Sequence, residues 1–118
     1  MQRVPKEFEI FGNRILVKGK KNLQDKDGEE VLGLCDVDEL TIWINSSVRG
    51  AKRWPVFLHE TGHMVLGLLG YDDLNDDDVF VDRVGQVVYQ ILKTVKYHAT
   101  RKSAPLSSSR PEEGSESD

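Results

Sequence analysis

Two consecutive stretches of helical periodicity, between residues 55 and 95, constrain the fold of this chain more than any other feature. The first begins at Pro55, which suits a first helical turn, and ends at Gly70, a typical C-terminal stop. The second follows Asn75, a good N-cap, and its apolar residues recur three or four positions apart. These residues are Val81, Val84, Val88, Ile91, Leu92 and Val95. The pattern predicts two helices, joined by a short turn, that pack against each other.

Shorter runs of strand-forming residues come before these helices. Residues 7–10 alternate between acidic and apolar side chains, Gly12 and Asn13 can turn the chain, and residues 15–17 can return it as a hairpin. A second pair is expected at residues 31–35 and 40–45. The sequence therefore predicts an α+β fold, in which a small antiparallel sheet packs on two main helices.

Composition divides the chain into two parts. Residues 99–118 contain Leu106 as their one large apolar side chain, so this segment cannot bury itself and is expected to be a disordered tail. The domain is predicted to span residues 4–98, a normal size for a single core.

Charge and cysteine content exclude several classes of protein. No apolar run approaches the roughly 18–20 residues of a membrane span, and no apolar run follows the first basic residues, so we expect a cytoplasmic protein without membrane contact. A net charge of −4 argues against a nucleic-acid partner. Cys35 is the only cysteine, so an internal disulfide is impossible and metal ligands must come from His, Asp or Glu.

The first predicted helix contains the motif H-E-x-x-H, formed by His59, Glu60 and His63. Histidines four residues apart lie on one helix face, so both rings can bind one ion. A carboxylate beside the first histidine can accept a proton from a metal-bound water. The motif predicts a zinc site that contains its own general base, Glu60.

A catalytic zinc needs a third protein ligand, and the second predicted helix offers two. Asp78 and Asp82 are four residues apart and share a face. We expect Asp78, nearer the helix start, to bind the metal and Asp82 to orient a histidine, with the reverse assignment as the alternative. His98, at the predicted domain end, is a less favoured ligand.

The segments that carry these features resemble the small zincin-type metallopeptidases, and more closely the SprT-like or ImmA/IrrE-like peptidases of phages and prophages. The resemblance rests on "VPKEFEIFGNRILVK" from Val4, "LTIWINSS" from Leu40, "FLHETGHMVLGLLGYDDLN" from Phe57 and "DDDVFVDRVGQVVYQILK" from Asp76. In gluzincins a Glu-x-x-x-Asp pattern supplies the third ligand and its partner, and Asp78 and Asp82 match it with an aspartate in the first position. Leu69 stands where metzincins have a third histidine.

This resemblance implies a minimal zincin-like domain that hydrolyses peptide bonds of a protein or peptide substrate, in the host cytoplasm if a phage encodes it. It also implies that the edge of strand 40–45 binds the substrate backbone, with Trp43 and Tyr71 as candidates for a side-chain pocket and an oxyanion donor. Two alternatives stay open. In one, zinc only stabilises a binding or regulatory module. In the other, no metal binds and an acidic surface contacts a basic partner.

Overall fold

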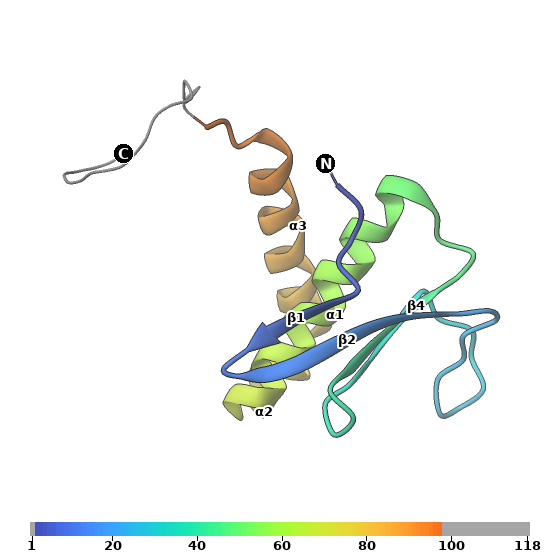
Figure 1. Ribbon diagram of the computed structural model, residues 1–118. Coiled ribbons are helices and arrows are strands. Elements are labelled where there is room, and N and C mark those ends of the chain that lie inside the picture. The colour runs from blue at the N-terminus through green and yellow to red at the C-terminus, as the bar shows by residue number, and fades with distance from the viewer. Residues whose placement is uncertain (1, 98–118) are drawn as a thin grey trace.

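A computed structural model describes residues 2–97, so the predicted tail (99–118) and His98 lie outside the described residues. The fold is α+β, as predicted (Figure 1). Its strands are β1 (Glu7–Ile10), β2 (Asn13–Lys20), β3 (Gly33–Asp36) and β4 (Thr41–Asn45). A short 3-10 turn, η1 (Gly50–Lys52), leads into the helices α1 (Arg53–Leu69), α2 (Asp72–Asn75) and α3 (Asp78–Thr94). Among residues 2–97, no helix is long and apolar enough to cross a membrane.

The four strands form one mixed sheet in the order β1-β2-β4-β3, which differs from the expected antiparallel sheet in one pairing. β1 pairs antiparallel with β2, and β3 with β4, but β2 and β4 run parallel. Parallel neighbours need a long connection. Here residues 21–32 carry the chain from the end of β2 to the far edge of the sheet, where β3 runs antiparallel to β2. β4 then returns between them in the direction of β2. β4 is therefore an interior strand.

One face of the sheet packs on α1 and forms the core. Strand alternation directs Ile15, Ile42 and Ile44 toward the helix, where they meet Phe57 and Met64 of α1. All five are at most 5% exposed. Each buried side chain of this size contributes about 1.5–3 kcal/mol through the hydrophobic effect, so this contact fixes α1 on the sheet.

α1 ends where the sequence predicts. Gly70 has φ of 80°, and its backbone N–H and that of Tyr71 donate to the carbonyls of Gly67 and Leu66. A left-handed residue after the last turn is the usual glycine stop, because a side chain there strains the backbone.

α3 packs on α1, and two glycines let the helices approach closely. A Cβ on Gly62 would lie 3.0 Å from Val81, and one on Gly85 would lie 3.5 Å from the backbone nitrogen of His59. The helix begins at Asp78 with Asp77 as its N-cap, whose side chain accepts a hydrogen bond from the Phe80 backbone N–H at 3.0 Å. The predicted N-cap, Asn75, was wrong, because the turn after α1 forms the separate helix α2.

Candidate metal centre

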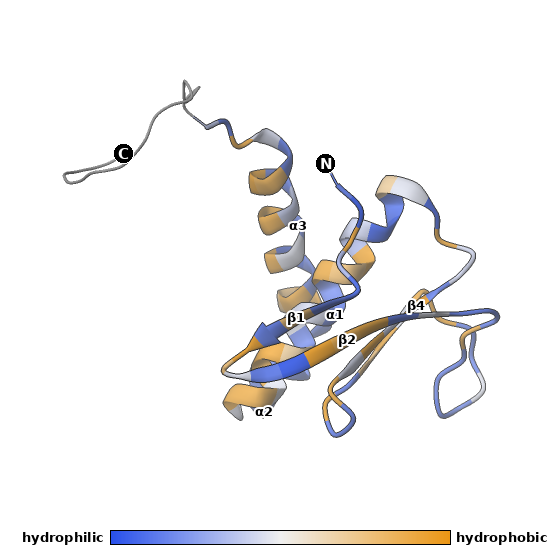
Figure 2. Ribbon diagram, in the orientation of Figure 1, coloured by the Kyte–Doolittle hydropathy of each residue, from blue (hydrophilic) through white to orange (hydrophobic). Residues whose placement is uncertain are grey.

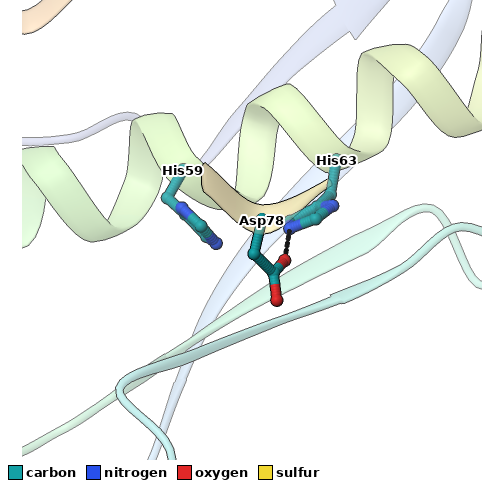
Figure 3. Close-up of side chains that lie close together, drawn as sticks. All are labelled: His59, His63 and Asp78. Carbon is teal, nitrogen blue, oxygen red and sulfur yellow. Dashed lines mark ion pairs between the residues drawn. The ribbon is translucent and has the colours of Figure 1, made fainter. Parts of the chain in front are cut away.

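The histidines of the H-E-x-x-H motif lie one turn apart on the face of α1 that meets the start of α3. Their ring centroids are 4.8 Å apart, and both side chains are largely buried. Asp78, the first residue of α3, points its carboxylate between them (Figure 3). One ligand atom from each of His59, His63 and Asp78 lies within 4.8 Å of the other two. Two imidazole nitrogens and one carboxylate oxygen are a donor set that suits zinc.

His63 is held by contacts to both of its ring nitrogens. Its Nε2 lies 3.2 Å from Asp78 Oδ1, and its Nδ1 lies 2.6 Å from the amide oxygen Oδ1 of Asn75. Because an amide oxygen only accepts hydrogen bonds, this contact favours a proton on Nδ1, and a neutral ring protonated there would offer the Nε2 lone pair to a metal. Asn75 therefore orients His63 and selects its tautomer, in the way that neighbours of metal-binding histidines usually do.

His59 has a carboxylate partner on the opposite side of its ring. Its Nδ1 lies 3.4 Å from Asp82 Oδ1, while the second oxygen of Asp82 accepts a hydrogen bond from Gln86 at 2.9 Å. The second ring nitrogen of His59, Nε2, lies on the side of its ring that is nearer to Asp78 (Figure 3). The structure thus brings Asp78 into the cluster of potential ligands and Asp82 against a histidine.

Glu60 projects from the same turn of α1 toward the sheet and is only 8% exposed. Burial raises its pKa from 4.5 to about 7, with His63 lowering the pKa and Asp78 raising it. A divalent cation at the three ligands would favour the ionised carboxylate, because it adds positive charge close by. With a pKa near 7, Glu60 can be neutral or ionised at neutral pH, and a cation at the three ligands would shift it to the ionised form.

Gly33, at the start of β3, makes room for Glu60. A Cβ on Gly33 would lie 2.9 Å from Cγ of Glu60 and 2.7 Å from a methyl of Val56. The sequence analysis gave this residue no role, although a glycine inside a strand is a signal of close approach by another group. Here β3 and α1 come close enough that the carboxylate fits only against a bare backbone.

A pocket of about 360 Å³ opens beside these groups. It is lined by Leu32, Gly33, Pro55, Val56, His59, Glu60 and Asp82. A larger cavity, of about 740 Å³, lies between residues 2–6 and the start of α1, and its lining contains none of the candidate ligands. The smaller pocket borders the candidate site through His59 and Glu60, whereas His63 and Asp78 lie outside its lining.

Three weaker candidates from the sequence lie elsewhere. Trp43 sits on the face of the sheet opposite α1, with Lys18 Nζ 5.6 Å from its ring centre. Tyr71 is 56% exposed and borders a different hollow, next to α2. The expectation that strand 40–45 offers a free edge was wrong, because β4 is paired on both sides. The edge beside the pocket belongs to β3.

Comparisons with known proteins supply no relative for this arrangement. No protein-family model matches the chain, and neither a curated protein nor a solved structure matches it significantly. The site is therefore interpreted from its own geometry.

Proposed function

We propose that this protein is a zinc-dependent peptidase, with His59, His63 and Asp78 as metal ligands and Glu60 as general base. The observation that carries the proposal is the convergence of three ligand atoms within 4.8 Å next to a buried carboxylate. A zinc ion held there would lower the pKa of a bound water toward neutrality and polarise a substrate carbonyl.

Glu60 has a chemical task in this reaction and no coordinating one. Its carboxylate accepts a proton from the attacking water and then delivers that proton to the leaving amine as the peptide bond breaks. The pocket of about 360 Å³ brings substrate to Glu60 and His59 together. Asn75 and Asp82 contact the two histidines at their Nδ1 atoms, which would leave both Nε2 atoms to bind the metal.

The edge of β3 gives the substrate backbone a place to bind. Within residues 2–97, β3 pairs only with β4, and its first residue, Gly33, lines the pocket. An extended peptide can add to such an edge by backbone hydrogen bonds, which explains how a small domain would bind a polypeptide without a deep cleft. This supports a protein or peptide substrate.

The metal part of the proposal is tested by elemental analysis of the purified protein. We expect about one zinc per chain, because two histidines and a carboxylate complete a three-ligand site. Replacing both His59 and His63 by alanine removes two ligands and should abolish zinc binding. A double variant that holds as much zinc as the wild type would place the metal elsewhere.

The catalytic part is tested with Glu60→Gln, which keeps size and polarity but removes the base. Peptide hydrolysis should fall by about 10²–10⁴-fold while zinc content persists. Glu39→Gln is the matched control, since Glu39 is exposed and lies outside the site. New peptide termini generated in a cell extract by the wild type, and lost with Glu60→Gln, would identify substrates. Equal cleavage by both proteins would reveal a contaminating protease.

A second function is favoured by where the site lies. Its ligands join α1 to the first residue of α3, which is where a structural zinc would hold two helices of a small domain together. In that case the protein is a zinc-stabilised binding or regulatory module. Full zinc occupancy without hydrolysis by the wild type would favour this module over the peptidase.

A further inference from the structure

α3 carries a row of apolar side chains that α1 covers only in part. The row consists of Phe80, Val84, Val87 and Ile91, which we call the α3 seam, and its members are between 38% and 58% exposed. Apolar segments recur along α3 where it extends beyond the other elements (Figure 2). A soluble surface rarely keeps so many large apolar groups together unless another molecule covers them.

The seam is distinct from the face that packs on α1. That packing face contains the buried residues Val81 and Gly85. At 3.6 residues per turn, the seam lies about 100° further around the helix axis. α3 is therefore apolar on two adjacent faces, and α1 accounts for only one of them.

A groove beside the seam can accept a side chain. It has a volume of about 280 Å³ and lies between the two helices, lined by Leu58, Val65 and Leu66 of α1 and by Phe80, Val84 and Val88 of α3. The groove continues the apolar surface of the seam onto α1. A helix laid along the seam would find a hole for one of its own apolar residues.

The spacing within the seam indicates a helical partner. Its residues follow one another at intervals of four, three and four, which is the repeat of a helix that packs in knobs-into-holes fashion. A second copy of α3 has the same repeat and the same length. It therefore matches the seam without requiring any other protein.

The charges on α3 favour an antiparallel pair. Asp76 and Asp77 directly precede the helix and Asp78 is its first residue, whereas Lys93 lies in its last turn and Lys96 follows two residues after its end. An antiparallel pair places the acidic start of each helix beside the basic end of the other, whereas a parallel pair would place like charges together. The macrodipoles of the two helices also oppose each other in the antiparallel arrangement.

We propose that the protein forms a symmetric homodimer through the α3 seam, with antiparallel helices and a two-fold axis near Val87. Around this axis Val84 of one copy faces Ile91 of the other, and Phe80 faces the region of Val95. This interface involves the exposed part of α3 and is independent of whether the metal site is catalytic.

Sedimentation analysis over a range of concentrations tests the association. The wild type should shift from monomer to dimer as concentration rises to the order of 100 µM. Ile91→Glu should weaken dimerisation at least about 10-fold, because it buries two unpaired charges. Val79→Glu is the matched control, since Val79 is 67% exposed but lies off the seam. A monomer at every concentration, or equal effects of the two variants, would overturn the proposal.

Disulfide trapping tests the orientation, with Cys35 replaced by serine. Val87→Cys, near the axis, should form a cross-linked dimer under mild oxidation. Phe80→Cys alone should not, because antiparallel helices separate the two copies of residue 80 by about 20 Å. A mixture of Phe80→Cys and Val95→Cys should cross-link. Rapid cross-linking of Phe80→Cys by itself would demonstrate a parallel pair and overturn the antiparallel arrangement.

Discussion

α1 and α3 are both 17 residues long, yet they are held in the molecule in very different ways. α1 lies between the sheet and α3, and its residues Phe57 and Met64 are part of the core. α3 packs on α1 and α2, and within it only Val81 and Gly85 are buried. The stability of the fold is therefore concentrated around α1.

The candidate ligands are divided between these two helices. His59 and His63 belong to the helix that the core fixes, whereas Asp78 and Asp82 belong to the first turns of the helix that is held on one face. A bound metal would thus link a rigid element to a less supported one. Metal binding and the position of α3 should depend on each other.

The largest expected difference between the helices is in stability. Met64→Ala removes a fully buried side chain and should lower the free energy of unfolding by about 2–5 kcal/mol. Ile91→Ala, at a residue that is 55% exposed, should change it by no more than about 0.5 kcal/mol in dilute, monomeric protein. Urea titration of the two variants measures both values. Equal losses would mean that α3 contributes to the core as much as α1 does.

A second prediction concerns Cys35, a residue of β3 that packs against the core around α1. Burial raises the pKa of the Cys35 thiol from 9.0 to about 12, with smaller contributions from the negative charges of Glu60 and Asp36. The folded state therefore favours the neutral thiol. The stability that this provides is complete below pH 9 and is lost as the pH rises toward 12.

Alkylation of Cys35 by iodoacetamide at pH 8 provides the measurement, because only the thiolate reacts. The native protein should react about 100- to 1000-fold more slowly than the same chain unfolded in urea, which serves as the control. Equal rates in the two states would show that the thiol is not shielded.

The sequence predicts the helices better than the sheet, and the reason is physical. Helical periodicity and the glycine stop at Gly70 are local signals, so α1 and its histidine spacing can be read from neighbouring residues. The direction of β4 depends on the path of residues 21–40, which no local pattern records. Two departures from the expected structure, the parallel pairing of β2 with β4 and the absence of a free edge at strand 40–45, have this common cause.

The same distinction applies within the candidate site. The spacing of His59 and His63 follows from helix geometry, and the four-residue interval from Asp78 to Asp82 does so as well. The contact of Asn75 with His63 depends on how the chain turns between α1 and α3, and the fit of Gly33 against Glu60 depends on β3 meeting α1. Such roles arise only when distant segments pack together, so sequence reasoning missed the contact of Asn75 with His63 and that of Gly33 with Glu60.

The two carboxylates of α3 should contribute unequally to metal binding. Asp78→Ala removes a proposed ligand, whereas Asp82→Ala removes a contact that orients His59 at 3.4 Å. Loss of an orienting partner usually lowers metal affinity about 10–100-fold, and we expect Asp78→Ala to exceed that loss. Competition with a chelator ranks the two variants. The reverse order would exchange the roles of Asp78 and Asp82.

The smallest of these effects is expected for Asn75→Ala, because it leaves every proposed ligand in place. Without the amide oxygen 2.6 Å from Nδ1, His63 can rotate and can place its proton on either nitrogen, so fewer molecules present a free Nε2 to the metal. Zinc affinity should fall toward the lower end of the 10–100-fold range. Asn75→Asp is the informative companion, since its carboxylate can also accept a hydrogen bond from the Nδ1–H group, so this variant should retain most of the affinity. If both variants bind zinc as tightly as the wild type, α1 alone orients His63. The contact from Asn75, in the connection between α1 and α3, would then contribute nothing to metal binding.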